Sequence, residues 1–331
     1  MKDYHVCGLG NAIVDIFIEV SEEEFAQLGY ERGTMRLVDV AEQNGLVDRF
    51  YHREPRLVSG GSVANSIIAL SQLGGKGAFI GCVGDDRYGL FYATEFEELN
   101  IDIGKPVIVG AATGTCVVLI TPDAERTMRT SLAVSSHLAA RHVDEERIKK
   151  SEWLFIEGYV FANPDTGQTA IREALALAKK HDTKVAVTCS EGFIVKEFGD
   201  AFREALQQTD LLFCNETEGC AVAGTLSAEQ AFRQLKGVVP SAVVTAGPRG
   251  AFVRHGDVET HVPAFPCTPK DLTGAGDMFA GAFLYGLTHD VPAAKAAKGG
   301  CYLAMKVISQ IGARLEQGTR QFWNEALGTA S

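Results

Sequence analysis

Residues 271–283 hold the strongest chemical signal in the sequence, a turn of small residues that leads directly into an apolar helix. Gly274, Ala275 and Gly276 let a ligand approach the backbone, because none of them carries a bulky side chain. Their N–H groups would lie at the start of the helix, where unpaired donors and the helix dipole attract anions such as phosphate. Asp277 follows in the first helical turn, where its carboxylate could accept the proton of an attacking hydroxyl group. The pattern predicts phosphoryl transfer with Asp277 as the base, unless Asp277 is only a favourable acid in a first turn.

A second glycine turn, at Gly60 and Gly61, is followed by another predicted helix. We expect Ser62 to cap this helix and Asn65, one turn further on, to form a hydrogen bond with a hydroxyl group of the substrate. In the alternative interpretation, the glycines only turn the chain and Asn65 is a surface residue. The order of this motif and its distance from Asp277 favour the functional interpretation.

Polar residues also follow the predicted strands of the main sheet. Asn215 and Glu218 come directly after an apolar strand, at the carboxyl end where open α/β sheets bind their ligands. They would hold Mg²⁺ through water, because that ion usually keeps several waters. A capping arrangement at the start of a helix explains the same pair equally well.

A loop after a later strand suits the binding of ATP. It contains Thr245, Gly247 and Gly250, and it occupies a position equivalent to that of Asn215. We expect Asn215 and this loop to bind ATP together with Gly274 and Gly276 of the glycine turn.

Short apolar runs alternate with amphipathic segments along most of the chain. This order favours a mostly parallel sheet with helices on both faces, and most of the predicted strands are apolar throughout, as such buried strands are. The predicted strands are Tyr4–Leu9, Ala78–Val83, Trp153–Ile156, Lys184–Thr188, Asp210–Phe213 and Ala242–Thr245. The predicted helices are Ser62–Leu73, Leu90–Leu99, Thr166–His181, Ala228–Leu235, Ala275–Leu287 and Val291–Ser309.

Two regions break this pattern and predict a small antiparallel sheet over one end of the main domain. Residues 13–20 alternate strictly, with apolar side chains at every second position from Val14 to Val20, so only one face of this strand would be buried. The second region forms two predicted strands, Thr115–Thr121 and Arg126–Thr130, joined by a turn. Half-exposed strands of this kind do not belong inside a parallel sheet.

The chain is expected to form one domain. Its 331 residues, 46% hydrophobic and 22% charged, suffice for one large α/β core with a small appendage. No low-complexity linker interrupts residues 1–331, so we expect a single unit whose lid is formed mainly by segments 12–58 and 107–133, inserted in the α/β core.

Charge and cysteine content exclude several classes of protein. The formal net charge of −11 disfavours nucleic acid and anionic membranes as partners. None of the eight cysteines forms a Cys-x-x-Cys pair, which is typical of reduced thiols in a cytoplasmic protein. The N-terminus lacks a signal-peptide pattern, and no apolar run approaches the ~20 residues of a membrane span, so we expect a cytoplasmic protein.

The combined motifs resemble the ribokinase family, that is, the PfkB carbohydrate and nucleoside kinases. Gly60-Gly61-Ser62-Val63-Ala64-Asn65 and Gly274-Ala275-Gly276-Asp277 match its two signatures, and Asn215-x-x-Glu218 matches its magnesium and phosphate motif. The likeness runs from about Val6 to Gly312, although Leu272 stands where the family usually has a small or β-branched residue. The resemblance implies a ribokinase-like three-layer α/β/α fold, a doubly wound and mostly parallel sheet with a small antiparallel β lid, and the use of ATP and Mg²⁺.

Within this family the sequence is most similar to adenosine kinases. The similarity lies in Gly8-Leu9-Gly10-Asn11 with Asp15, in Thr113-Gly114-Thr115-Cys116 and in the segment 212–218. It implies that the acceptor is a nucleoside and that these residues contact it: Asn11, Asp15, Gly60, Gly61, Asn65, Cys116 and Phe193. Asp15, Gly61 and Asn65 would hold the sugar hydroxyls, and Asn11 would lie near the base. Phe193 matches one ring that stacks on the base, but Val160 stands where another is expected, with Tyr159 and Phe161 beside it.

The resemblance implies two further roles. Arg126 on the lid would close over the transferred phosphate and would join Gly274, Ala275, Gly276 and Asp277 in catalysis, because its guanidinium group donates charge-assisted hydrogen bonds to phosphoryl oxygens. Asp271, Thr273 and Gly312 resemble positions around a monovalent-cation site, which implies K⁺; a self-satisfied turn is an equally good explanation.

The sequence therefore favours an ATP-dependent phosphotransferase that phosphorylates the hydroxymethyl group of a nucleoside. A kinase for a sugar or sugar acid, of the ribose, fructose or ketodeoxygluconate class, is the alternative, because the same fold serves both. A dinucleotide-dependent oxidoreductase is excluded, because Ile13 replaces the third glycine after Gly8-x-Gly10. A pure binding protein would not need Asp277. The expected partners are small molecules, and the protein would be a monomer or a homodimer paired through its lid.

Overall fold

The computed structural model describes residues 2–104, 106–123 and 125–329. The strands of its main sheet are β1 (Tyr4–Leu9), β5 (Gly77–Ile80), β10 (Ser151–Ile156), β11 (Lys184–Thr188), β12 (Leu211–Asn215), β13 (Ser241–Thr245), β14 (Ala251–His255) and β15 (Val258–Val262). Their order is β15-β14-β13-β12-β11-β10-β1-β5. All neighbours from β13 to β5 pair in parallel, and β14 and β15 add an antiparallel edge.

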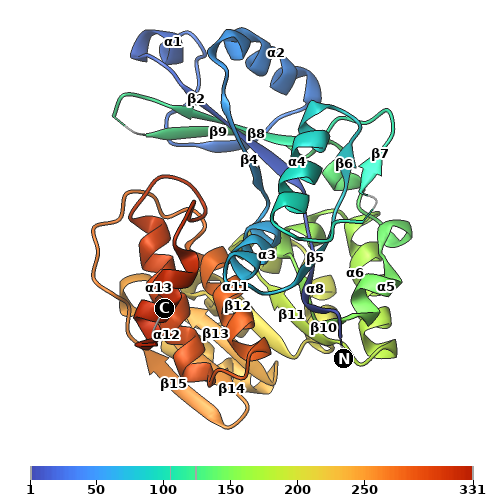
Figure 1. Ribbon diagram of the computed structural model, residues 1–331, viewed down its shortest axis with the longest axis vertical. Helices are drawn as coiled ribbons and strands as arrows, with labels where there is room; N and C mark the ends of the chain where they lie inside the picture. The colour runs from blue at the N-terminus through green and yellow to red at the C-terminus, as the bar shows by residue number, and fades with distance from the viewer. Residues whose placement is uncertain (1, 105, 124, 330–331) are drawn as a thin grey trace.

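Helices cover both faces of this sheet, which confirms the predicted three-layer fold (Figure 1). One face carries α3 (Ser62–Gln72), α11 (Ala275–Thr288), α12 (Ala293–Ile308) and α13 (Thr319–Leu327). The other carries α5 (Glu145–Lys149), α6 (Gly167–Lys180), α7 (Gly192–Glu197), α8 (Gly199–Leu206), α9 (Glu216–Ala223) and α10 (Ala228–Gln234). Successive strand residues point to opposite layers, so Val6 belongs to one buried cluster and Cys7 to the other.

A second sheet forms the lid above the carboxyl ends of the main strands (Figure 1). It contains β2 (Ile13–Glu19), β3 (Met35–Leu37), β4 (Arg56–Gly60), β8 (Gly114–Ile120) and β9 (Arg126–Ser131), in the order β3-β9-β8-β2-β4. β2 pairs with β4 and β8 with β9 in antiparallel fashion, whereas β2 with β8 and β3 with β9 are parallel. Helices α1 (Glu22–Ala26) and α2 (Val40–Phe50) cover the outer face of this sheet.

The predicted alternation of the first lid strand is confirmed. Val14, Ile16 and Ile18 are buried and pack in one cluster with Phe25 of α1 and Phe50 of α2. The intervening side chains therefore point to the opposite face of the sheet, toward the main domain, because strand residues alternate. One of these intervening side chains is Asp15.

Two local predictions are wrong. Residues 78–83 do not form one strand, because the chain leaves the main sheet after Ile80 and Val83–Gly84 (β6) pairs with Val107–Ile108 (β7) in a separate two-stranded sheet. Ser62 does not cap α3; Gly61 occupies that position with φ 109° and gives no side-chain hydrogen bond. The other predicted helices agree within a few residues, with α4 at Arg87–Glu98. Short 3₁₀ turns lie at Tyr51–Arg53, Ala133–His137, Ala140–His142, Gly158–Ala162, Leu235–Gly237 and Gly247–Arg249.

Helix α11 lies at the centre of its layer, with every residue from Met278 to Gly286 buried. It packs against α3 at Gly281, where a Cβ atom would lie 2.2 Å from the carbonyl oxygen of Ser66. Only glycine permits this approach, which brings the N-termini of the two helices together. The two glycine turns that the sequence predicts therefore meet beneath the lid.

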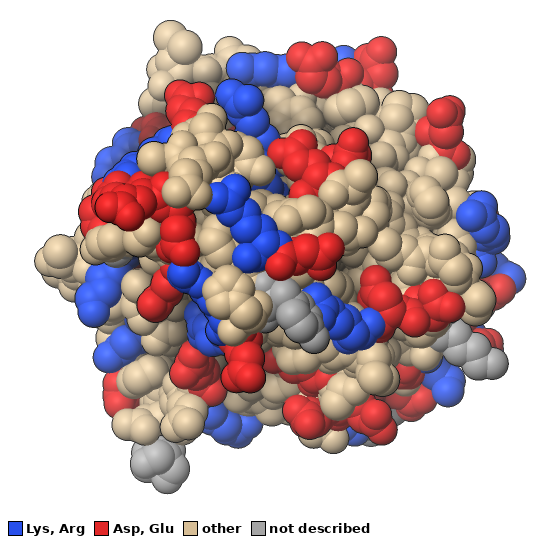
Figure 2. All heavy atoms as spheres, turned by 90° about the horizontal axis from the view of Figure 1, so that it is seen from above, with Lys and Arg blue, Asp and Glu red and all other residues tan. Residues whose placement is uncertain are grey.

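Charged side chains and cysteines are distributed as follows in the described residues. Seen from above, acidic and basic side chains are interspersed on the lid, so the residues described on this face form no basic stripe for a nucleic acid (Figure 2). Within the described ranges, no helix is both long and apolar enough to cross a membrane. All eight cysteines are free thiols, and six of them are buried.

Candidate active site

Asp277 lies in the first turn of α11, at the bottom of the cleft beneath the lid. Its Oδ1 accepts a hydrogen bond from Ser62 Oγ at 2.7 Å, and its Oδ2 accepts one from Asn65 Nδ2 at 3.1 Å. Burial raises the pKa of Asp277 to about 6, although these two hydrogen bonds act in the opposite direction. A carboxylate with this pKa is ionised at neutral pH and is more basic than an ordinary aspartate, as a general base requires.

The turn before Asp277 has the geometry of an anion site. Gly274 has φ 77°, and a Cβ atom there would lie 2.0 Å from the carbonyl oxygen of Ala313. Gly276 faces open space, since nothing lies within 4 Å of its Cβ position. Because the first N–H groups of a helix have no intrahelical partner, Ala275 and Gly276 can present theirs to an anion.

Asn65 and Ser62 lie between Asp277 and the predicted site for the substrate that accepts the phosphoryl group. Asn65 is buried, and its Oδ1 has no hydrogen-bond partner among the described residues. A buried acceptor without a partner is costly, so a substrate hydroxyl is the group that would satisfy it. Ser62 was not predicted as a site residue, because its place before an apolar helix is also that of a cap.

Asp15 and Gly60 lie together in the lid, on neighbouring strands. A Cβ atom on Gly60 would lie 2.9 Å from Asp15 Oδ2, and one on Gly61 would lie 2.1 Å from the carbonyl oxygen of Asn11. Burial raises the pKa of Asp15 to about 7, and Arg314 and Arg126 act to lower it. Asp15 thus faces the cleft as a hydrogen-bond acceptor for hydroxyl groups.

Asn11 lies behind these residues in a buried polar network. Its Nδ2 donates to Glu157 Oε1 at 2.7 Å, and its Oδ1 accepts from Ser135 Oγ at 3.2 Å. Glu157 Oε2 also accepts from the backbone N–H of Val63 at 3.1 Å. Both polar atoms of the Asn11 amide are therefore already engaged, so its predicted place near a base stays a prediction.

Glu157 is a site residue that the sequence interpretation missed. It is 1% exposed and follows β10, and burial raises its pKa to about 7. The two hydrogen bonds that it accepts tie the segment after β1 to the start of α3. The rule that found Asn215, a polar residue just beyond a parallel strand, would also have found Glu157.

The aromatic residues at the back of the cleft differ from expectation. Val160 and Phe161 are each 1% exposed and belong to the core of the main domain, so neither can stack on a ligand. Tyr159 instead lies beside Phe193, with ring centroids 6.4 Å apart, and Phe193 is 45% exposed. Cys116 is buried beside Ile13 in the lid and pairs in register with Asp15.

A cavity of about 430 Å³ adjoins the glycine turn and lies where ATP was predicted. Its residues include Thr245, Gly247, Gly250, Ala275 and Gly276, together with apolar side chains from α11 and α12. Apolar walls with a few polar groups at one end suit the base and the phosphates of a nucleotide, respectively. The predicted nucleotide loop and the anion site thus share one cavity.

Asn215 and Glu218 form a capping box at the start of α9. Asn215 Nδ2 donates to Glu218 Oε1 at 2.7 Å, and Asn215 Oδ1 accepts from the backbone N–H of Glu218 at 2.9 Å. Burial raises the pKa of Glu218 to about 7, and the negative charges of Glu191 and Asp277 raise it further. This acidic environment suits a hydrated Mg²⁺, whereas the described side chains form no cluster of three or more direct ligands.

Asp271, Thr273 and Gly312 do come together, and hydrogen bonds link them to one another. Asp271 Oδ1 accepts from the N–H and the hydroxyl of Thr273 at 3.1 and 2.7 Å, and its Oδ2 accepts from the N–H of Gly312 at 2.8 Å. Arg126 Nη1 also donates to Oδ2. The carboxylate that K⁺ would need is surrounded by donors.

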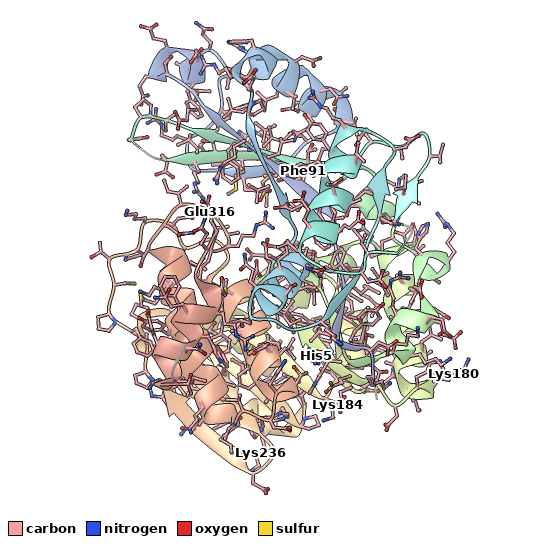
Figure 3. All side chains as sticks on the ribbon, in the orientation of Figure 1. His5, Phe91, Lys180, Lys184, Lys236 and Glu316 are labelled. Carbon is pink, nitrogen blue, oxygen red and sulfur yellow. The ribbon has the colours of Figure 1, made fainter. Side chains whose placement is uncertain are left out.

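A second cavity, of about 330 Å³, is lined by Asp15 and Phe17 of the lid and by the loop that follows α12. Two ion pairs border it, Arg314 with Glu95 at 2.7 Å and Arg56 with Glu316 at 3.0 Å. Glu316 lies between the lid and the helices of the main domain (Figure 3). These ion pairs join lid strand β4 and helix α4 to the loop that follows α12.

The chain is similar to known proteins in sequence and in fold. The chain matches the family model described as pfkB family carbohydrate kinase over residues 34–319. It is 28% identical to a ribokinase of Haemophilus influenzae, over 80% of this chain and 86% of that protein. It is 25% identical to an adenosine kinase of Saccharomyces cerevisiae, over 92% of this chain and 94% of that protein. The crystal structure of adenosine kinase from Sinorhizobium meliloti superposes with a TM-score of 0.86 at 29% identity, covering 98% of this chain and 99% of the other.

Proposed function

The chain belongs to the pfkB family of carbohydrate kinases, and we propose that its acceptor is a nucleoside, whose hydroxymethyl group receives the terminal phosphoryl group of ATP. The observation that carries this proposal is the position of Asp277. It lies between the hydrogen-bonding side chains of Ser62 and Asn65 and a nucleotide-sized cavity that ends at Gly276. A base between an acceptor site and an anion site is what phosphoryl transfer to an alcohol needs.

The chain's own groups support each part of the reaction. Asp277 accepts the proton as the hydroxymethyl oxygen attacks the terminal phosphorus of ATP, and the bond from that phosphorus to the bridging oxygen breaks to release ADP. The N–H groups of the glycine turn stabilise the charge on the phosphoryl oxygens. Ser62 and Asn65 hold the Asp277 carboxylate in place. Mg²⁺, when bound near Asn215 and Glu218, would neutralise charge on the phosphates.

The ring pair of Tyr159 and Phe193 supports a nucleoside acceptor. Tyr159 follows Glu157 by two residues, its ring lies beside that of Phe193, and Phe193 is 45% exposed, which leaves its face available. Purine and pyrimidine bases stack on aromatic side chains, and such a contact is worth about 1–3 kcal/mol per base. Asp15 and the free Oδ1 of Asn65 would then accept hydrogen bonds from sugar hydroxyls.

A sugar or sugar acid is the second candidate. Asp15 and Asn65 offer only hydroxyl-binding chemistry, and any sugar can use it. The exposure of Phe193 also means that the rings do not enclose the end of the cleft.

The two candidates are separated by ADP release with ATP, Mg²⁺ and a panel of nucleosides, sugars and sugar acids. The proposal predicts turnover with nucleosides, and Tyr159→Leu should lower kcat/KM for them by about tenfold because a stacking contact is lost. Turnover only with free sugars, unaffected by Tyr159→Leu, would replace the nucleoside by a sugar. The matched control is Phe161→Leu, which changes a ring of the same size in the core.

The oligomeric state is a related proposal. Helices α1 and α2 cover the outer face of the lid, so two lids cannot pack face to face there without displacing them. Met35 and Leu37 on edge strand β3 are 53% and 64% exposed. We propose a monomer; a dimer through this edge, detected by sedimentation and lost in Leu37→Lys, would contradict it.

A further inference from the structure

The ion pair of Arg126 and Asp271 links the lid to the turn that leads to the anion site. Arg126 is the first residue of β9, and Asp271 begins the turn that leads to Asp277. The two side chains are only 14% and 9% exposed. An ion pair shielded from water in this way is harder to break than a surface pair, because either partner alone would be a buried charge.

The Asp271 carboxylate accepts four hydrogen bonds, one from Arg126 and three from other groups. Its oxygens accept from Arg126 Nη1, from the N–H and hydroxyl of Thr273 and from the N–H of Gly312. A carboxylate has about four lone-pair sites, so these donors use its capacity. Gly312 presents its N–H to the carboxylate, whereas a potassium site is built from oxygen atoms.

The other end of the guanidinium group is free. Arg126 Nη2 is buried and has no hydrogen-bond partner in the part of the chain that the structure describes. The ring of Phe17 holds the group from the side, with its centroid 5.9 Å from the guanidinium carbon. Arg126 therefore has Nη1 bound to Asp271 and Nη2 available for a further hydrogen bond. Asp271 lies three residues before Gly274, where the anion site begins.

We propose that Arg126 takes the place of a monovalent cation at Asp271, so that turnover does not depend on K⁺, and that Asp271 is the positioning residue that aims the free end of Arg126 at the transferred phosphoryl group. This inference rests on the proposed kinase chemistry. The arginine charge does what a bound cation would do at the edge of the anion site, and it does so only when the lid is in place.

The first test compares KCl with choline chloride at constant ionic strength, using the full chain. We expect turnover equal within about twofold, and an equal melting temperature, because no specific ion binds the folded state. Saturable activation by K⁺, or a rise in melting temperature with K⁺ alone, would overturn the proposal. If no acceptor is phosphorylated in either salt, the proposed function fails, while the melting temperatures still test the cation site.

The second test is a double-mutant cycle of Arg126→Ala and Asp271→Asn. Each variant should lower kcat by about 100-fold with a smaller change in KM for ATP, and the double variant should be no worse than the poorer single one. If the fold-loss of kcat in the double variant equals the product of the two single losses, Asp271 does not act through Arg126.

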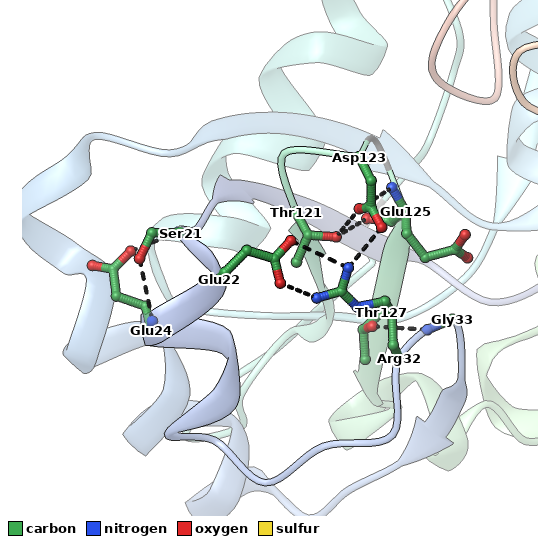
Figure 4. Close-up of polar contacts among 9 residues, drawn as sticks. All are labelled: Ser21, Glu22, Glu24, Arg32, Gly33, Thr121, Asp123, Glu125 and Thr127. Atoms are coloured by element: carbon green, nitrogen blue, oxygen red, sulfur yellow. Dashed lines mark hydrogen bonds and ion pairs between the residues drawn. The ribbon is translucent and has the colours of Figure 1, made fainter.

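Arg32→Ala is the matched control for a lid arginine. Arg32 pairs with Glu22 and with Asp123, which lies in the turn between β8 and β9, and it makes no ion pair with Asp271 (Figure 4). Its effect on kcat should be small and should multiply with that of Asp271→Asn, because Arg32 and Asp271 share no partner among the described residues. Coupling as strong as that of Arg126 would show that the cycle reports general loosening of the lid and would contradict the proposal.

Discussion

Asp271 and Asp277 lie at the two ends of one turn, but their surroundings are opposite in character. Burial with neutral donors leaves the pKa of Asp277 raised to about 6. Burial acts on Asp271 in the same direction, but hydrogen bonds from Gly312 and Thr273 and the charge of Arg126 outweigh it, so its pKa is lowered. Neutral donors orient a carboxylate and keep it basic, whereas a cation and several N–H groups make it a permanent anion. The same turn thus holds a carboxylate that can act as the general base and a carboxylate that binds the lid.

Replacing the base should have the largest effect. Asp277→Asn keeps the shape of the side chain but removes the proton acceptor, so turnover should fall by about 100- to 10,000-fold. Binding of ATP, measured by calorimetry, should change little, because the cavity at Gly276 is unaltered. Near-normal turnover in this variant would remove Asp277 from its role.

Forcing the two glycine turns apart should affect stability as well as turnover. In Gly281→Ala the new Cβ atom would meet the carbonyl oxygen of Ser66 at 2.2 Å, so α3 and α11 must separate. Overpacking of this kind costs about 1–3 kcal/mol of the free energy of unfolding, which denaturant titration would measure. Gly237→Ala is a control, since nothing lies within 4 Å of that Cβ position. Equal stability of the two variants would contradict the tight contact.

The pH dependence should separate the two carboxyl groups. Because Asp277 must be ionised to accept a proton, kcat/KM should rise with pH through about 6 and then level off. Ser62→Ala removes a hydrogen bond that favours the ionised form, so the rise should move to higher pH, with turnover lower by about tenfold. Asp271→Asn should leave the position of the rise unchanged. An unshifted profile in Ser62→Ala would mean that another group controls it.

The ion pair at the edge of the lid should matter least. Arg56 and Glu316 are 49% and 78% exposed at their side chains, and exposed pairs contribute only about 0–1 kcal/mol. Glu316→Gln should therefore change both melting temperature and turnover only slightly, even though it joins the lid to the main domain as the Arg126 pair does. If Glu316→Gln lowered turnover as much as Asp271→Asn, any contact between the lid and the main domain would support turnover equally well.

The parallel strands of the main sheet and the floor of the site could be predicted because their signals are local, whereas the antiparallel edge strands β14 and β15 were not predicted. A continuous apolar run specifies a covered strand, and a small-residue turn before an apolar helix specifies an anion site, whatever the rest of the chain does. Asp277, Gly274 and Gly276 could be found in this way. The first lid strand followed from its alternation, and β8 and β9 followed from the turn that joins them, whereas β3 and β4 were not predicted.

The missed features depend on contacts between distant segments. Ser62 reaches Asp277 only because α3 packs on α11, and Glu157 joins two segments that meet beyond parallel strands. Whether Tyr159 or Val160 faces the cleft depends on how a 3₁₀ turn is oriented after β10, which a sequence pattern does not specify. Likewise, nothing near Asp271 in the sequence indicates that its partner would be Arg126.

The most direct test of the central claim is to follow the phosphorus NMR spectrum of the wild-type protein with ATP, Mg²⁺ and adenosine. The account predicts that a phosphomonoester signal and ADP grow together in equal amounts, and that neither grows with Asp277→Asn. Release of inorganic phosphate without a phosphomonoester, or equal transfer by the variant, would contradict it.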